Sequence, residues 1–392
     1  MKLSQRAQSI DPFFAMEFGK RAAVPEAQGH RVIKLSLGEP DFGPPPAVLE
    51  AARELVGGAL PYTAALGTPA LRAAIAGFYL REHGVTIDPN RIIVTAGASA
   101  ALLLVTAALV DAGDEVIVGD PSYPCNRQFL SSFGARVKLV ATDAASRFQL
   151  SRDSVRANWT AQTRGLMIAT PSNPTGTSVS PSELRAICDW AREHGAWRIV
   201  DEIYLNLGDR DEAGRPPQTV LAFDDGAIVI NSFSKYFGMT GWRLGWTVVP
   251  EAMVPTMERL AQNYYICPST LSQGAALACF TAESLDVCEA RRVEFARRRA
   301  LVLAGLAGIG LPVPVPPDGA FYVYFDVSGT GLTAREFCER APEEVHVALT
   351  PGKDFGHVGA DRYVRLSYAT SAENLQEAVR RLGTFMAGLH SA

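Results

Sequence analysis

One lysine in the stretch INSFSKYFGMTGWRLGW, residues 230–246, has the surroundings of a reactive amine. Lys235 follows an apolar run that ends near Ser232, and Gly238, Gly241 and Gly245 come after it. A lysine amine withdrawn from water can add to a carbonyl carbon and then move protons. Glycines let the backbone pass close to a ligand and turn sharply. The stretch therefore predicts a lysine that is held for chemistry.

Polar residues follow four more apolar runs in the same part of the chain. The five segments are Gly97-Ala98-Ser99, Pro121-Ser122-Tyr123-Pro124, Pro171-Ser172-Asn173-Pro174, Asp201-Glu202-Ile203-Tyr204 and Ser232 to Lys235. Ligands of open α/β sheets bind where parallel strands end, because loops meet there in a crevice. We therefore expect these segments to come together around one site.

The elements that must position these residues alternate between strand and helix from about residue 90 to 250. Continuous β-branched runs separated by helical segments are typical of a parallel sheet covered on both faces. We predict an α/β fold with a seven-stranded, mostly parallel sheet. The expected division is an N-terminal arm at 1–45 that is also part of the small domain, a large ligand-binding domain at 46–290, and a smaller α+β domain at 291–392.

Two strands are expected in the smaller domain. The segments DGAFYVYFDV and DRYVRLSYAT alternate like strands with one exposed face, and helical segments flank them. On such a strand an arginine is usually a solvated edge charge, and Arg365 is therefore ambiguous from the sequence alone.

Composition excludes several classes of function. The 392 residues are 47% hydrophobic and carry 37 basic and 41 acidic side chains, and no basic run indicates nucleic acid or a membrane surface as a partner. The six cysteines are scattered without metal-ligand spacing, so we expect free thiols and no metal site. The first residues lack a secretory signal pattern, which favours the cytoplasm.

Taken together, these segments resemble the class I/II aminotransferases, which are fold-type I enzymes that use pyridoxal 5′-phosphate (PLP). The resemblance covers nearly the whole chain. Its landmarks are GEPDF at 38–42, PYTAALGTPALR at 61–72, TAGAS at 95–99, PSYP at 121–124, PSNPTG at 171–176, DEIY at 201–204, SFSKYFGMTGWRLG at 232–245, DGAFY at 318–322 and RLSYA at 365–369. Each landmark alone is weak to moderate as a signal, and it is their joint order and spacing that is specific.

The resemblance implies an enzyme that moves an amino group from an L-amino acid to a 2-oxo acid by a ping-pong Schiff-base mechanism. Lys235 would form the Schiff base, and Asp201 would keep the pyridine nitrogen of PLP protonated. Asn173 and Tyr204 would donate hydrogen bonds to the phenolic oxygen O3′, and Tyr123 would stack on the ring.

The phosphate of PLP would be bound by backbone, hydroxyl and guanidinium groups. The residues implied are Ala98, Ser99, Ala100, Ser232, Ser234 and Arg243, together with Tyr62 of the partner subunit in a homodimer. The α-carboxylate of the substrate would be bound by Arg365, with Gly38 and Asn173 as helpers.

The resemblance leaves the substrate open. Some bacterial aspartate-specific members have a lysine where Ser99 stands here, which argues against a dicarboxylate and for a neutral, apolar or aromatic amino acid. Candidates for the side-chain pocket are Ile10, Phe14, Tyr123, Tyr264 and Tyr265. A PLP-dependent lyase, synthase or oxidase is an alternative, because the same lysine serves those reactions. A ligand-sensing protein without catalysis is a more distant one.

Overall fold

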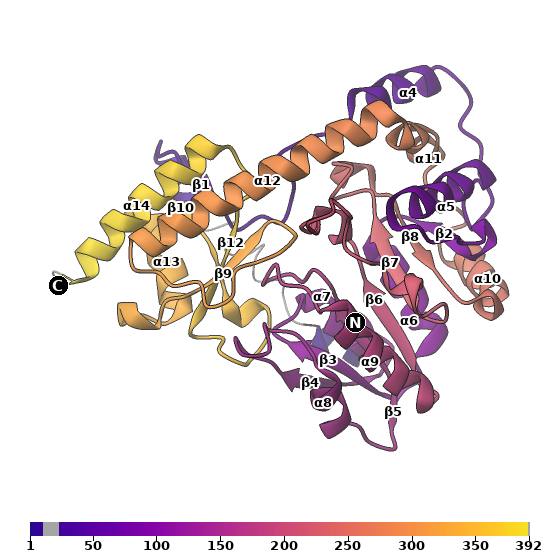
Figure 1. Ribbon diagram of the computed structural model, residues 1–392, viewed down its shortest axis with the longest axis horizontal. Coiled ribbons are helices and arrows are strands. Elements are labelled where there is room, and N and C mark those ends of the chain that lie inside the picture. The colour runs from indigo at the N-terminus through magenta and orange to yellow at the C-terminus, as the bar shows by residue number, and fades with distance from the viewer. Residues whose placement is uncertain (11–22, 391–392) are drawn as a thin grey trace.

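The computed structural model describes residues 1–10 and 23–390. Its largest sheet has seven strands in the order β2-β8-β7-β6-β5-β3-β4 (Figure 1). The strands are β2 (Ile92–Thr95), β3 (Glu115–Asp120), β4 (Arg136–Ala141), β5 (Thr163–Ala169), β6 (Trp197–Asp201), β7 (Ile228–Ser232) and β8 (Gly245–Val248). Strands β4, β3, β5, β6 and β7 pair in parallel, and β8 is antiparallel to both β7 and β2. The predicted α/β fold with seven mostly parallel strands is confirmed.

Both faces of this sheet are covered by helices, which explains why its strands are apolar throughout. The helices of this part of the chain are α4 (Pro46–Val56), which packs on α11 and not on the sheet, α5 (Pro69–His83), α6 (Ala98–Leu109), α7 (Pro124–Ser132), α8 (Arg152–Ala157), α9 (Pro181–Glu193), α10 (Val254–Tyr264) and α11 (Thr270–Ala276). On one face, Ile199 and Ile230 share a core with Val105 of α6 and Met257 of α10. Alternate strand residues such as Val200 point to the other core, with residues of α5 and α9.

The C-terminal part builds a second, three-stranded sheet in the order β11-β12-β9. Its strands are β9 (Tyr322–Asp326), β11 (Thr350–Pro351) and β12 (Tyr363–Ser367), and its helices are α13 (Ala334–Glu344) and α14 (Ala372–His390). The 27-residue helix α12 (Ala282–Gly308) extends from the region of α11 to α14 and connects the two parts of the molecule (Figure 1).

Strands β9 and β12 do not have an exposed face, so this sequence expectation was wrong. All five residues of each strand are buried. One face packs on helices, since Phe325 contacts Phe337 of α13. On the other face Tyr324 packs against Phe148, which precedes α8. Because both faces are covered, the alternation of polar and apolar residues marks two different interiors and not a boundary with water.

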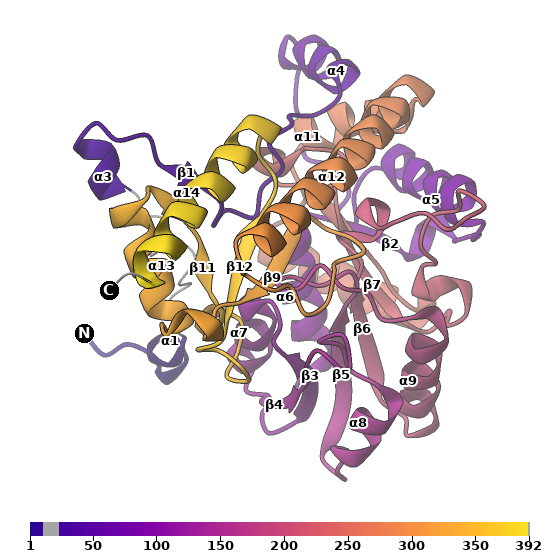
Figure 2. The ribbon, with the colours of Figure 1, turned by 60° about the vertical axis from the view of Figure 1, so that its left-hand side comes forward.

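The start of the chain contributes a short strand to the C-terminal part. Strand β1 (Ile33–Lys34) pairs in parallel with β10 (Val347–Ala348). Figure 2 shows α3 (Ala23–Ala27) and β1 on the side of the molecule where α14 lies, and Arg31 hydrogen-bonds Asn374 of α14. Helix α1 (Gln5–Ser9) is the first element of the chain.

Short 3₁₀ segments complete the connections. They are η1 (Pro89–Arg91), η2 (Leu205–Leu207), η3 (Val220–Ala222), η4 (Thr240–Trp242), η5 (Glu251–Met253), η6 (Leu277–Phe280), η7 (Ser328–Thr330) and η8 (Gly352–Asp354). The six cysteines are free thiols. Within the described ranges, no helix combines the length and apolar character that crossing a membrane requires, and no cluster of side chains has a metal-binding arrangement.

Candidate active site

A cavity of about 250 Å³ opens at the carboxyl ends of β5, β6 and β7 and is closed by residues near β1, β9 and β12. It is lined by Ser36, Leu37, Gly38, Glu39, Ala98, Ser99, Leu102, Tyr123, Ala169, Asn173, Asp201, Ile203, Tyr204, Ser232, Ser234, Lys235, Thr240, Arg243, Tyr322 and Arg365. All the site residues predicted from the sequence line this cavity except Ala100 and Tyr62. Parallel pairing explains much of this, because Asp201 and Ser232 are the last residues of neighbouring strands.

The amine of Lys235 lies within the cavity and is only partly solvated. Its Nζ donates a hydrogen bond of 2.6 Å to the carbonyl oxygen of Gly38. Burial lowers the pKa of Lys235 to about 8, although the negative charge of Glu39 opposes this shift. A substantial fraction of neutral amine is therefore present near pH 8, which a nucleophile and base requires.

Asp201 is a buried carboxylic acid at the end of β6. Burial raises its pKa to about 7, and the backbone N–H of Ile203 and the charge of Lys235 partly oppose that rise. The N–H of Ile203 donates to Oδ1 over 3.1 Å. A positively charged partner stabilises the ionised form of a buried carboxylate more than any neutral partner does, so Asp201 favours a ligand with a protonated nitrogen at this position of the cavity.

The beginning of α6 is suited to bind an anion. Gly97 is its N-cap and has no side chain that could accept from the first N–H groups of the helix. The guanidinium of Arg243 lies beside it, because a Cβ added to Gly97 would meet Arg243 Nη2 at 2.7 Å. The sequence therefore uses glycine here to bring a guanidinium and free backbone donors to the same place.

The hydroxyl groups of Ser232 and Ser99, near the start of α6, differ in whether they can donate a hydrogen bond to a ligand. Ser232 Oγ donates to the carbonyl oxygen of Leu244 over 3.2 Å and accepts from the N–H of Ser234 over 3.0 Å. Its hydrogen is thus engaged inside the protein. Ser99 is exposed and lines the cavity at the first turn of α6.

Arg365 is a fully buried arginine that lines the cavity, and not the edge charge that its strand suggested. Its Nη1 donates to Asn173 Oδ1 over 2.8 Å, and its Nη2 donates to the carbonyl oxygen of Ser36 over 2.6 Å. Its Nε is buried and has no hydrogen-bond partner among residues 1–10 and 23–390. A buried guanidinium with a free N–H favours a carboxylate as its ligand.

Two residues of the cavity were missed by sequence reasoning as functional candidates. Tyr322 donates to or accepts from Tyr204, with 2.8 Å between the two hydroxyl oxygens. Glu39 faces Lys235 closely enough to affect its pKa. Both lie in landmarks of the sequence, DGAFY and GEPDF, but their partners are more than 100 residues away, so no local pattern identified them.

Other predicted residues lie away from the cavity within one chain. Tyr62 has 80% of its surface exposed, and Ala100 lies further along the first turn of α6. Among the candidates for the side-chain pocket, Ile10 and Tyr264 are exposed and do not line the cavity, and neither does Tyr265. Phe14 lies outside the described residues.

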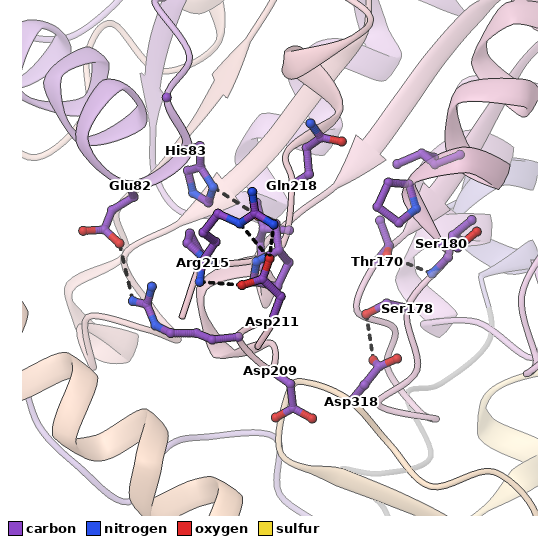
Figure 3. Close-up of a pocket in the computed structure, with 18 of the residues that line it drawn as sticks. Glu82, His83, Thr170, Ser178, Ser180, Asp209, Asp211, Arg215, Gln218 and Asp318 are labelled. Atoms are coloured by element: carbon purple, nitrogen blue, oxygen red, sulfur yellow. Dashed lines mark hydrogen bonds and ion pairs between the residues drawn. The ribbon is translucent and has the colours of Figure 1, made fainter. Parts of the chain in front are cut away.

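A larger cavity of about 870 Å³ lies elsewhere, between the end of α5 and the beginning of α9 (Figure 3). None of the predicted site residues lines it. Several of its charged side chains form ion pairs with one another, as Arg215 does with Asp211 and Arg147 with Asp318. Among the described residues that line it there is no lysine, and no arginine has a buried N–H without a partner, whereas the smaller cavity has both.

Comparisons with known proteins agree with this geometry. A family model for aminotransferase class I and II matches residues 30–382. The chain is 39% identical to a valine–pyruvate aminotransferase of Mycobacterium tuberculosis, over 96% of this chain and 97% of the relative. It is 34% identical to an arginine–pyruvate transaminase of Pseudomonas aeruginosa, over 99% of both chains. A solved structure of an aspartate aminotransferase from Thermus thermophilus with maleate superposes with a TM-score of 0.91 at 35% identity, covering 98% of this chain and 99% of that one.

Proposed function

The chain belongs to the class I and II aminotransferases, and we propose that it performs their amino-group transfer with PLP bound in the cavity around Lys235. The observation that carries this proposal is the meeting of three groups in one cavity. They are a lysine amine with a pKa of about 8, a buried carboxylic acid and a buried guanidinium with an unpaired N–H.

The residues present fit PLP. When bound, PLP supplies an aldehyde that reacts with amines and a ring that withdraws electrons from the substrate Cα. The start of α6, Ser99, Ser234 and Arg243 would hold its phosphate, and Ser232 would orient the N–H of Ser234. Asp201 would bind the ring nitrogen, because the positive charge of the protonated nitrogen would offset the free-energy cost of a buried, charged carboxylate.

The side-chain amide of Asn173 has a defined orientation that suits this role. Its Oδ1 accepts from Arg365, so its Nδ2 hydrogens remain to donate to O3′ of the cofactor. Tyr204 would donate to the same oxygen, and Tyr123 would cover one face of the ring. Asn173 thus connects the group that binds the substrate carboxylate with the group that binds the cofactor.

Lys235 would act as the nucleophile and then as the base. Its neutral amine is accessible near pH 8, and the hydrogen bond to Gly38 restrains the side chain at one side of the cavity. From there Nζ would take the proton from the substrate Cα and deliver it on the same side. Arg365 would fix the α-carboxylate meanwhile, with its free Nε as one of the donors.

The charges of the cavity favour a neutral amino acid as donor. Among the described residues that line it, the cations are Lys235, Arg243 and Arg365, and each has a role above. Ser99 offers no charge to a second carboxylate, and Glu39 would repel one. The relatives are named for valine, arginine and aspartate, so the family accommodates each class. A panel in which aspartate is the best donor by a wide margin would contradict this assignment.

A homodimer is part of the proposal. Tyr62 is 80% exposed, and Val56 at 63% and Ile266 at 51% are further exposed apolar side chains. The loops of Tyr62 and Ile266 are adjacent, since the N–H of Thr63 contacts Cys267 Sγ over 3.4 Å, and an exposed apolar patch of this kind favours a protein–protein interface. Tyr62 of the partner subunit would then reach the phosphate bound at α6.

The test is a visible absorption spectrum of the purified protein with PLP. The lysine-bound band should form in the wild type, disappear when an amino donor is added and return with a 2-oxo acid such as pyruvate or 2-oxoglutarate. In Lys235→Ala this cycle should be lost. A band that never forms in the wild type would exclude the cofactor, and one that forms without cycling would favour a lyase or oxidase.

A further inference from the structure

Two buried tyrosines meet at the boundary between the two sheets. Tyr204 follows β6 of the large sheet, and Tyr322 begins β9 of the small sheet. Their hydroxyl oxygens are 2.8 Å apart, and the two residues are 3% and 0% exposed. No other hydrogen bond is formed by the Tyr322 hydroxyl within the described part of the chain.

The number of phenolic hydrogens decides the direction of this bond. Each hydroxyl has one hydrogen to donate, and each oxygen can also accept. If Tyr204 gives its hydrogen to O3′ of the cofactor, only Tyr322 can donate in the bond between the two phenols. We propose that Tyr322 is a positioning residue that donates to Tyr204 and thereby strengthens the hydrogen bond from Tyr204 to the cofactor oxygen. This inference rests on the proposed function.

The surroundings of Tyr322 favour its hydroxyl as the donor in the hydrogen bond to Tyr204. The guanidinium carbon of Arg365 lies 4.7 Å from the centre of its ring, and this positive charge withdraws electrons from the phenol, although the negative charge of Glu39 acts in the opposite direction and more weakly. Hydrogen bonds in a buried chain also polarise one another, so a donor to Tyr204 makes Tyr204 a better donor in turn.

The backbone leaves room for this arrangement at one position. A Cβ on Gly38 would lie 2.6 Å from the hydroxyl oxygen of Tyr322. Glycine at position 38 therefore lets the chain that accepts from Lys235 pass directly over the tyrosine pair. The three contacts connect Lys235, Tyr322 and Tyr204 around one point of the cavity.

The readout is the pH midpoint at which the visible band of bound PLP changes. A hydrogen bond donated to O3′ disperses the negative charge on this oxygen, and that charge would hold the proton on the nearby nitrogen that joins Lys235 to PLP. A weaker hydrogen bond to O3′ should therefore raise the pH midpoint. Tyr322→Phe should raise it by about half to one pH unit, the effect expected of one buried hydrogen bond. Tyr204→Phe should raise it further, and the double variant should match Tyr204→Phe.

A matched control lies two residues away on the same strand face. Tyr324 is also buried, and its hydroxyl has no hydrogen-bond partner among the residues that the structure describes. Tyr324→Phe should leave the midpoint unchanged, whereas a nonspecific effect of losing a buried hydroxyl would shift it too.

A second variant keeps the shape of the residue and reverses the expected sign. Incorporation of 3-fluorotyrosine at position 322 makes the phenol more acidic and a stronger donor, so the midpoint should fall. It remains informative if Tyr322→Phe does not fold. An unchanged midpoint in either variant, with the band present, would overturn the inference. Absence of the band from the wild type would instead refute the proposed function.

Discussion

Replacing Arg365 by lysine keeps the positive charge in the cavity and removes the planar guanidinium. The arginine holds Asn173 Oδ1 at 2.8 Å and the carbonyl oxygen of Ser36 at 2.6 Å through two different nitrogens, with Nε unpaired. A single ammonium nitrogen cannot reach these acceptors and a substrate carboxylate together. We expect at least one hydrogen bond of a charged group to be lost in the transition state, about 1.5–3 kcal/mol. That loss corresponds to a decrease in kcat/KM of roughly 10- to 160-fold.

The assay is kcat/KM for the best amino donor of a panel, measured for wild type, Arg365→Lys and a control. Arg362→Lys is a suitable control, because Arg362 lies three residues earlier, is 55% exposed and pairs with Asp326 outside the cavity. It should remain within about twofold of wild type, because Arg362 does not line the cavity and lysine keeps a positive charge beside Asp326. If Arg365→Lys decreases kcat/KM no more than Arg362→Lys does, the assignment of Arg365 to the substrate carboxylate is wrong.

Three further predictions test other parts of the structure. Asp201→Asn should lower kcat by at least about tenfold, because a hydrogen bond to a charged group is lost at the ring nitrogen of PLP. PLP methylated at that nitrogen carries a permanent charge and should restore part of the rate of this variant in single-turnover measurements. Equal rates of the variant with PLP and with methylated PLP would contradict the assignment of Asp201 to the ring nitrogen. In the protein without PLP, burial lowers the pKa of Lys235 from 10.5 to about 8, so between these pH values the folded state binds fewer protons than the unfolded chain and the free energy of unfolding rises with pH. In denaturant titrations the wild type should therefore become more stable relative to Lys235→Met from pH 8 to pH 10.5. A difference that does not change with pH would argue against a buried amine. Gly356→Ala should destabilise the protein by about 1–3 kcal/mol, because the added Cβ would overlap the Asp120 carboxylate that accepts from the N–H of His357. The control in thermal unfolding is Gly388→Ala in α14, where nothing lies near and alanine should favour the helix; a midpoint for Gly356→Ala as high as that of the control would refute the clash.

Much of the large sheet could be predicted because its signals are local. Apolar runs of five to seven residues between helical segments specify buried parallel strands, and the residues after each run must then lie along one edge. Asp201 and Ser232 follow this rule directly, and Asn173 comes shortly after β5. The burial of β9 and β12 could not be read in the same way, since a strand between two interiors alternates like one that faces water.

The sequence by itself determined the α/β fold and the family, and it predicted most of the functional residues that line the cavity. It could do so because strand patterns and motifs can be recognised in short segments. Only the tertiary structure decided which groups meet across the cavity. Asn173 and Arg365 are 192 residues apart, and Tyr204 and Tyr322 are 118 apart. Such contacts depend on how the small sheet packs against the large one, and this packing follows from the whole buried surface. The surroundings of Arg365 and the contact between the two tyrosines could therefore be described only with both sheets in place.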